Sequence, residues 1–286
     1  MKPANAIELP GDIPDIVRVA LREDVGDGDA TSCLIEDREH VNAYVKVRES
    51  AILCGCAWFN EVFHQTDPSI QIDWLCDDAD ELHANQTVCR LNGSARSLLT
   101  AERTALNFLQ TLSGTATVTN QFVQAIAEYR TRILDTRKTV PGLRNAQKYA
   151  VRIGGGTNHR HGLYDGILIK DNHQYATHSL ESILRGLPDS RPALIEVEIE
   201  RLDQLEGALR CGANRIMLDN FSVDNIAQAV KINAHRVELE ASGNIDLGNI
   251  REVARTGVDY ISVGAITKNV RAIDFTMLFD SSGANA

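Results

Sequence analysis

The densest group of residues able to bind an anion lies between Arg130 and Lys170, in a chain whose formal net charge is −10. The stretch holds only two acidic residues, Asp135 and Asp165. A positive cluster inside an acidic protein favours a small polyanionic ligand, whereas nucleic acid calls for a broad basic face. The basic side chains are Arg130, Arg132, Arg137, Lys138, Arg144, Lys148, Arg152, Arg160 and Lys170.

Seven of these nine basic residues fall into two groups by their surroundings. Arg144, Lys148 and Arg152 are spaced four apart in a helical pattern, which favours a solvent-exposed stripe over a binding role. The other group sits beside predicted strand ends or glycines, where a side chain can reach a ligand. We therefore assign the anion to Arg137, Lys138, Arg160 and Lys170.

The elements that must position these residues follow Tyr129. Six apolar runs rich in β-branched residues alternate there with helical stretches such as 202–210, 223–232 and 250–255. Buried parallel strands have this composition, and repeated strand–helix units predict a barrel or a doubly wound sheet. The runs are Arg132–Thr136, Gly166–Lys170, Ala193–Glu200, Arg215–Asn220, Arg236–Ala241 and Tyr260–Gly264.

A charged, polar or glycine-containing segment stands at the end of each of these runs. Carboxyl ends of parallel strands meet at one mouth, so we expect these groups to converge. The segments are Thr136-Arg137-Lys138, Lys170-Asp171-Asn172-His173, Glu198-Ile199-Glu200, Asp219-Asn220, Ser242-Gly243-Asn244 and Val263-Gly264-Ala265.

The chemistry of this mouth is that of a phosphorylated, carboxylated substrate. Arginine and lysine suit carboxylates and phosphates. Glu198 and Asp219 need a reason to lie among cations, and Mg²⁺ bridging a diphosphate together with ribose hydroxyls supplies one. Backbone N–H groups of Ser242–Asn244 and of Gly264-Ala265 suit a phosphate. The Gly154-Gly155-Gly156 run matches no nucleotide-binding fingerprint.

The N-terminal half predicts a different architecture. Alternating Ala43, Val45 and Val47 indicate a half-buried strand, and further short strands are expected at 51–54, 70–75 and 87–91. Helical patterns at 13–22 and 58–64 complete an α+β sandwich. A helical connector follows over 97–129, with a break expected at Gly114 and with Arg103 on its polar side.

Bulk properties restrict the class of protein. No apolar run approaches the roughly 20 residues that span a bilayer, and the N-terminus lacks the apolar core of a secretory signal. The six cysteines are scattered, as in a cytoplasmic protein with reduced thiols. We therefore expect a cytoplasmic location and neither nucleic acid nor membrane as partner.

The sequence also resembles a known family. The run DTRKTVPGLR from Asp135 and the run KYAVRIGGGTNHRHGLYDGILIKDNH from Lys148 resemble quinolinate phosphoribosyltransferases, as does the opening EDVGDGDAT. The likeness extends from about Leu21 to Phe279. It implies an N-terminal α/β sandwich over 1–115 and an incomplete α/β barrel of six or seven strands over 116–271. The tail, about 272–286, would return to the first domain.

The resemblance also implies an activity. The family transfers a phosphoribosyl group from phosphoribosyl pyrophosphate to quinolinate, giving nicotinate mononucleotide, pyrophosphate and CO₂ in NAD biosynthesis. It works as a homodimer with Mg²⁺ and without an organic cofactor. Matching by residue gives Lys138, Glu198 and Asp219 as catalytic. Glu198 and Asp219 would also hold the ribose hydroxyls and Mg²⁺, directly or through phosphoribosyl pyrophosphate.

The resemblance extends to substrate contacts. Quinolinate would be held by Arg137, His159, Arg160 and Lys170, together with Arg103 of the neighbouring subunit. Thr136, Lys138, Glu198 and Asp219 would also bind substrate, with Lys138 between quinolinate and the ribose diphosphate. The 5′-phosphate would be held by Ser242, Gly243, Asn244, Gly264 and Ala265. His161 and Tyr164 depart from the wording we expect of the family and receive no role.

Other functions remain open at this level. A related phosphoribosyltransferase could use nicotinate or another acidic heterocycle. An aldolase or isomerase barrel would use a lysine such as Lys170 as a Schiff base. A ligand-binding dimer without activity is the third alternative, against which Lys138, Glu198 and Asp219 speak.

Overall fold

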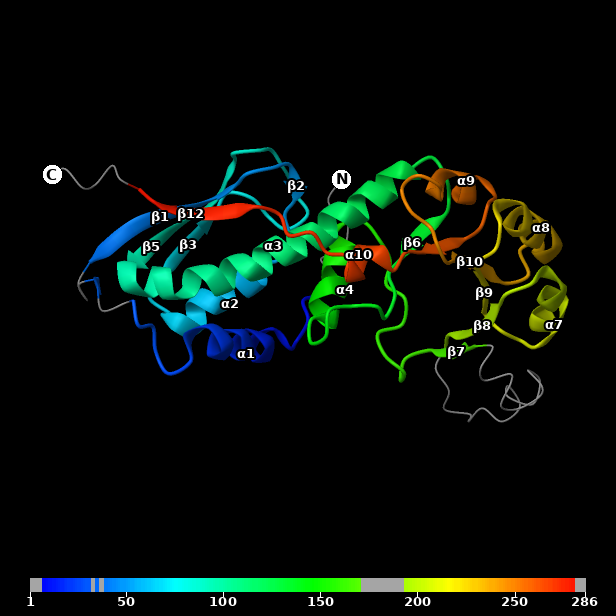
Figure 1. The fold of residues 1–286 in the computed structure, drawn as a ribbon, viewed down its shortest axis with the longest axis horizontal. Coiled ribbons are helices and arrows are strands. Elements are labelled where there is room, and N and C mark those ends of the chain that lie inside the picture. Colours follow the sequence, from blue (N-terminus) through cyan, green and yellow to red (C-terminus); the bar gives the residue numbers. More distant parts are fainter. Residues whose placement is uncertain (1–6, 32–33, 36–38, 171–192, 281–286) are drawn as a thin grey trace. The chain divides into compact units, whose positions relative to one another are not determined.

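The computed structural model describes residues 7–31, 34–35, 39–170 and 193–280. The chain forms two compact units (Figure 1). The first comprises residues 1–120, 140–155 and 269–286, and the second comprises 121–139 and 156–268. Segment 140–155 thus groups with the N-terminal unit, although it lies between two barrel segments in the sequence.

The first unit is built on an antiparallel sheet of order β12-β1-β5-β3. The burial of β1 alternates from Ala43 onward, as predicted for a half-buried strand. The C-terminal strand pairs with β1, with Val45 opposite Met277. A two-stranded ladder, β2 with β4, completes the strands of this unit. Their bounds are β1 His40–Val47, β2 Ala51–Ile52, β3 Gln71–Trp74, β4 Glu81–Leu82, β5 Thr87–Ser94 and β12 Phe275–Phe279.

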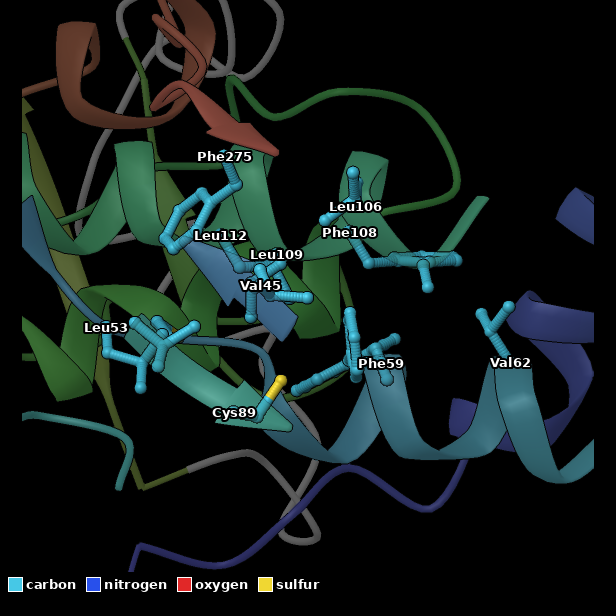
Figure 2. Packing of buried hydrophobic residues seen from close by; sticks show 14 of the residues in the cluster. Val45, Leu53, Phe59, Val62, Cys89, Leu106, Phe108, Leu109, Leu112 and Phe275 are labelled. Carbon is cyan, nitrogen blue, oxygen red and sulfur yellow. The ribbon is translucent and has the colours of Figure 1, made fainter. Parts of the chain in front are cut away.

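Buried side chains from the antiparallel sheet and from the helices together form the hydrophobic core of this unit (Figure 2). Phe59 stacks at 4.9 Å from Phe63 and at 5.2 Å from Trp74, measured between ring centroids. Burying each such side chain contributes about 1.5–3 kcal/mol. The helices are α1 Ile13–Val25, α2 Cys56–Thr66, α3 Ala95–Ala125 and α4 Arg144–Ile153.

The expected break at Gly114 is wrong, because α3 continues through it to Ala125. The glycine serves a close approach instead of a turn. A Cβ atom built on Gly114 would lie 2.2 Å from the backbone oxygen of Arg271. The same crossing is fixed by the N–H of Ile273, which donates to the oxygen of Gln110 at 3.1 Å. The C-terminal segment therefore needs a residue without a side chain at position 114.

Gly114→Ala is expected to lower the free energy of unfolding by about 1–3 kcal/mol, because backbone must move to admit the methyl group. Gly207→Ala is the matched control. Gly207 also lies in a helix, and a Cβ there would meet no atom within 4 Å. The control should be neutral or more stable, by up to about 1 kcal/mol. Urea unfolding of both variants decides, and equal midpoints would contradict the close approach.

The predicted basic stripe on α4 is also wrong. Arg152 is exposed, but Lys148 is fully buried and Arg144 is half-buried. The middle of α4 is packed inside the first unit: the Tyr149 ring lies 5.3 Å from that of Trp58, and its hydroxyl donates to Asp78 at 2.8 Å. A spacing of four residues shows which side chains share a face, but not what covers that face.

The second unit contains a six-stranded parallel sheet of order β6-β11-β10-β9-β8-β7. All six predicted strands are confirmed, as are the three predicted helices. Within the described residues no ladder joins β6 to β7, so the barrel is incomplete, as the resemblance implied. The strands are β6 Arg132–Leu134, β7 Ile167–Ile169, β8 Ile195–Ile199, β9 Arg215–Asp219, β10 Glu238–Ser242 and β11 Tyr260–Ser262.

Short helices follow most of these strands. The N-cap hydroxyl of Ser222 accepts a hydrogen bond from the N–H of Asn225 and so starts α8. Among the described residues, no helix combines the length and apolar character needed to cross a membrane. The helices of this unit are α7 Leu205–Arg210, α8 Val223–Asn233, α9 Ile250–Arg255 and α10 Ala265–Lys268, with a 3₁₀ turn at Leu202–Gln204.

Candidate active site

The carboxyl edge of the parallel sheet brings Asp219 and the Ser242–Asn244 loop together. Asp219 is paired in register with Ser242. The N–H of Asn220 donates to the oxygen of Ser242 at 2.8 Å, and the amide of Asn244 donates to Oδ1 of Asn220 at 3.1 Å. Gly243 has φ +94°, and a Cβ there would lie 2.2 Å from Oδ1 of Asn220. Glycine at this position is what lets the loop close against the end of β9.

A second group forms where β6 and β11 end. The N–H of Lys138 donates to Oγ1 of Thr136 at 3.0 Å, and the hydroxyl of Thr267 donates to the oxygen of Lys138 at 2.8 Å. A Cβ on Gly264 would lie 3.2 Å from Cδ of Lys138. Thr136, Lys138 and Gly264, predicted separately from two strand ends, therefore lie side by side.

Two arginines of the basic stretch share one neighbourhood. Burial lowers the pKa of the Arg160 guanidinium, and the positive charge of Arg137 lowers it further. Arg160 is held in place by its Nη1, which donates to the oxygen of Gly166 at 3.0 Å. Two like charges brought close together repel, and a bound anion relieves that repulsion. The negative charges of Glu196 and Asp165 raise the pKa of Arg160 and so offset part of this effect.

Lys170 and Glu198 form an ion pair of 3.1 Å across the neighbouring strands β7 and β8. The lysine side chain is 48% exposed, whereas that of Glu198 is 9% exposed. We predicted Lys170 as a contact of quinolinate and Glu198 as a contact of the ribose hydroxyls and Mg²⁺. In the structure the two side chains contact each other. Asp171, Asn172 and His173, predicted at the same strand end, lie outside the described residues.

His159 is buried in the second unit. Its Nε2 lies 2.8 Å from Oε2 of Glu196 and 3.4 Å from Oε2 of Glu240. The main chain beside it is fixed by Asp135, whose carboxylate accepts from the N–H of His159 at 2.8 Å and from Asn158 at 2.6 Å. The predicted contact of this ring with quinolinate stays a prediction.

Burial and neighbouring charges shift the pKa values of His159 and Glu196. Burial alone would lower the pKa of His159, but Glu196 and Glu240 outweigh it and raise that pKa to about 9. Burial, helped by Glu240, raises the pKa of Glu196 to about 7. The cluster therefore retains a proton at neutral pH that belongs to His159 and Glu196 jointly.

The hydrogen bond from the Arg160 main chain decides where that proton lies. The N–H of Arg160 donates to Nδ1 of His159 at 2.7 Å. An imidazolium would direct its own Nδ1–H at this donor, whereas a neutral ring protonated on Nε2 accepts the hydrogen bond. The geometry therefore favours a His159 ring with its proton on Nε2, the atom 2.8 Å from Oε2 of Glu196.

Four residues of this network were missed by sequence reasoning: Asp135, Glu196, Arg215 and Glu240. Arg215 lies 2.8 Å from Glu238 and 3.6 Å from Glu240, and its guanidinium stacks 4.1 Å from the centroid of the Tyr260 ring. A signal existed in the alternation of β8 and β10. Residues two apart in a strand face the same side, so Glu196 shares its side with Glu198.

The remaining predicted residues are separate or unassigned. Arg103 is exposed on α3 in the first unit. Ala265 begins α10, directly after Gly264. Tyr164 is 78% exposed, and the N–H of His161 donates to Asp165 at 2.7 Å. Neither His161 nor Tyr164 has a functional explanation in the structure.

Comparison with known proteins gives one consistent result. Residues 29–113 match the model of the quinolinate phosphoribosyl transferase N-terminal domain, and residues 115–278 match that of its C-terminal domain. A relative from Bacillus subtilis, named as a probable nicotinate-nucleotide pyrophosphorylase (carboxylating), is 42% identical over 89% of each chain. A relative from Synechocystis with the same name is 39% identical over 90% of this chain and 89% of its own.

Solved structures agree with these matches. The structure of the nicotinate-nucleotide pyrophosphorylase from Francisella tularensis superposes with a TM-score of 0.92 at 48% identity, covering 98% of this chain and 100% of that one. Both family models and the full-length likeness extend over the sandwich and the barrel strands. These likenesses show that this chain belongs to the quinolinate phosphoribosyltransferase family.

Proposed function

We propose that this protein transfers the phosphoribosyl group of phosphoribosyl pyrophosphate to quinolinate and releases pyrophosphate and CO₂, forming nicotinate mononucleotide for NAD synthesis. The observation that carries the proposal is a set of strand ends in the second unit that presents the cations Lys138 and Lys170 together with the carboxylates Glu198 and Asp219. An acidic acceptor and a phosphorylated ribose need these two kinds of group. The names of the relatives at 39–42% identity support the same reaction.

The proposed substrate contacts follow the grouping of side chains. Arg137 and Arg160 bind the carboxylates of quinolinate, with Lys170 and His159 as further contacts. Lys138, held between Thr136 and Gly264, lies between this acid and the ribose diphosphate. The Ser242–Asn244 loop, with Gly264 and Ala265, receives the 5′-phosphate through backbone N–H groups.

The carboxylates Glu198 and Asp219 fit Mg²⁺ and ribose hydroxyls. They lie on neighbouring strands and on the same side of the sheet, since Glu198 is in register with Met217, two residues before Asp219. Carboxylate oxygens are the ligands Mg²⁺ prefers, either directly or through a bound diphosphate. When bound, the ion neutralises charge on the leaving diphosphate.

The reaction then depends mainly on position and charge. Cations at the diphosphate assist its departure while C1 of the ribose gains oxocarbenium character, and Glu198 and Asp219 hold the ribose hydroxyls. The clamped carboxylates aim the pyridine nitrogen at C1, which gives rate by orientation and electrostatics. The resulting pyridinium stabilises the electron pair that stays on C2 when the 2-carboxylate leaves as CO₂, and a proton from water then takes its place on C2. No side chain is needed as a base.

The unit of function in this proposal is a homodimer in which Arg103 of one subunit enters the site of the other. Its exposure on α3 leaves the guanidinium accessible to a partner. We also propose a cytoplasmic location, where free thiols such as Cys54 and Cys89 persist. Cell fractionation tests the location, and sedimentation tests the dimer.

The deciding experiment is a product assay. Purified protein with quinolinate, phosphoribosyl pyrophosphate and Mg²⁺ should release CO₂ and pyrophosphate in equal amounts. Chelation with EDTA should abolish both, and added Mg²⁺ should restore them. Consumption of phosphoribosyl pyrophosphate without CO₂, or no consumption at all, would contradict the proposed reaction.

A further inference from the structure

We propose that Glu196 and Glu240 are positioning residues that orient the His159 ring so that it anchors the main chain of Arg160 for substrate binding. The contact of Arg160 with substrate rests on the proposed function, whereas the orientation of the ring does not. Neither glutamate belongs to the group of residues assigned to substrate or Mg²⁺. Their placement on the inner side of the sheet is what requires a role.

Both carboxylates are withdrawn from solvent. The side chains of Glu196 and Glu240 are 0% exposed, and that of His159 is 6% exposed. Burying such groups is costly unless each is compensated by charge or hydrogen bonding. Nε2 of His159 is within ion-pair distance of both carboxylates, 2.8 Å from Oε2 of Glu196 and 3.4 Å from Oε2 of Glu240. Arg215 offsets the remaining negative charge, from 3.6 Å away on Glu240.

The ring transmits this arrangement to Arg160. Nδ1 accepts the N–H of Arg160 at 2.7 Å, so the ring carries its proton on Nε2, the atom that lies 2.8 Å from Oε2 of Glu196. The other end of Arg160 is fixed by the oxygen of Gly166 at 3.0 Å from Nη1. A Cβ on Gly166 would approach Cβ of Arg160 to 3.1 Å, so the side chain passes close to this backbone. Arg160 is therefore held at its main-chain N–H by His159 and at its guanidinium by Gly166.

A metal ion is the competing explanation of the same three side chains. Their ligand atoms lie within 4.8 Å of one another, which is compatible with a small cation. Metal binding through Nε2 would move the ring proton to Nδ1, where it would face the Arg160 N–H. The Arg215 guanidinium beside Glu240 opposes a second positive charge. The acceptor role of Nδ1 and the charge of Arg215 therefore favour a positioning cluster over a metal site.

Replacing one of the two glutamates should change the orientation of the His159 ring and leave the main chain at His159 in place. Asp135 holds the main chain of His159 and the side chain of Asn158 independently of the cluster. We therefore expect Glu196→Leu to fold while its His159 ring loses its nearest partner. Glu196→Gln keeps the shape and an oxygen that accepts from Nε2, so it should preserve the orientation.

The first measurement is the ¹⁵N spectrum of histidine-labelled protein, which distinguishes protonated from unprotonated ring nitrogens. The His159 signals are identified by their loss in His159→Asn. Wild type and Glu196→Gln should show Nδ1 without a proton and Nε2 with one, and Glu196→Leu should not keep this pattern. A wild-type ring protonated on Nδ1 at neutral pH would overturn the proposal whether or not the enzyme is active and whether or not Glu196→Leu folds.

The second measurement separates positioning from general damage. Glu196→Leu should raise KM for quinolinate about tenfold or more, the effect of a lost hydrogen bond near a charged group, while KM for phosphoribosyl pyrophosphate changes less than about twofold. Glu196→Gln should restore KM for quinolinate. Glu206→Gln is the matched control: Glu206 lies on α7 of the same unit with a side chain 52% exposed and pairs with Arg236, outside the cluster. It should leave both KM values unchanged.

Two results would contradict this inference from kinetics. One is an equal rise of both KM values in folded Glu196→Leu, and the other is a failure of Glu196→Gln to restore quinolinate binding. If wild type turns over no quinolinate, the proposed reaction fails while the ring spectra still decide the positioning of His159. If the reaction holds and the spectra disagree, the positioning proposal alone fails.

Discussion

Arg103→Ala and Lys138→Ala proteins, each nearly inactive alone, should regain activity when mixed under conditions that allow subunits to exchange. Each variant loses a charge-assisted contact to an anionic substrate, roughly tenfold to over a hundredfold in rate. Arg103 lies in the first unit and Lys138 in the second. If Arg103 serves the partner's site, a mixed dimer carries both changes in one site and neither in the other. Random exchange then leaves about a quarter of all sites intact.

The measurement is turnover of quinolinate before and after exchange, with mixed dimers counted by native mass spectrometry. Arg152→Ala is the matched control, because Arg152 belongs to the same basic stretch but is exposed on α4. It should be active alone and should not alter the result of mixing. Mixed dimers present in the expected proportion but without activity would show that Arg103 acts within its own subunit or not at all.

Much of the barrel unit could be predicted because its strands are buried on both sides. Continuous apolar runs mark such strands, and the carboxyl ends of parallel strands share one edge. This geometry was enough to place Thr136, Lys138 and Gly264 together, and Asp219 with Ser242, from residues far apart in the sequence. Their chemical roles are a separate question that the product assay addresses.

Three features could not be predicted from the sequence, because each depends on which distant residue packs against it. Gly114 resembles a helix break, yet it accommodates the backbone of Arg271, which follows 157 residues later in the chain (271 − 114). Lys148 resembles a surface charge, yet α4 buries it. Glu196 and Glu240 resemble ordinary strand charges until the His159 ring is placed between them. Pattern and propensity carry no information about such long-range partners.

Quinolinate should be turned over far more efficiently than nicotinate, by about 10⁴-fold in kcat/KM if the site resembles others built for a polar group. The reason is the surplus of positive charge. Lys170 is already paired with Glu198, whereas the charge of Arg137 lowers the pKa of Arg160, an effect that a second substrate carboxylate would reduce. Arg103 of the partner would add another cation. Nicotinate has one carboxylate and would leave part of this charge uncompensated, at a cost of several kcal/mol for a buried group.

The comparison is made with equal concentrations of the two acids, with Mg²⁺ and phosphoribosyl pyrophosphate present, following mononucleotide and CO₂. Arg160→Ala should reduce the ratio of kcat/KM for quinolinate to kcat/KM for nicotinate, because the variant lacks a guanidinium that pairs with the second carboxylate of quinolinate. Arg152→Ala, exposed and outside the pair, should keep the full selectivity. Comparable kcat/KM for both acids in wild type, or mononucleotide from quinolinate without CO₂, would overturn the choice of substrate. A phosphoribosyltransferase acting on a broader set of acids would then explain the site, since the charge of Arg137 and Arg160 would be compensated by solvent ions instead of a second carboxylate.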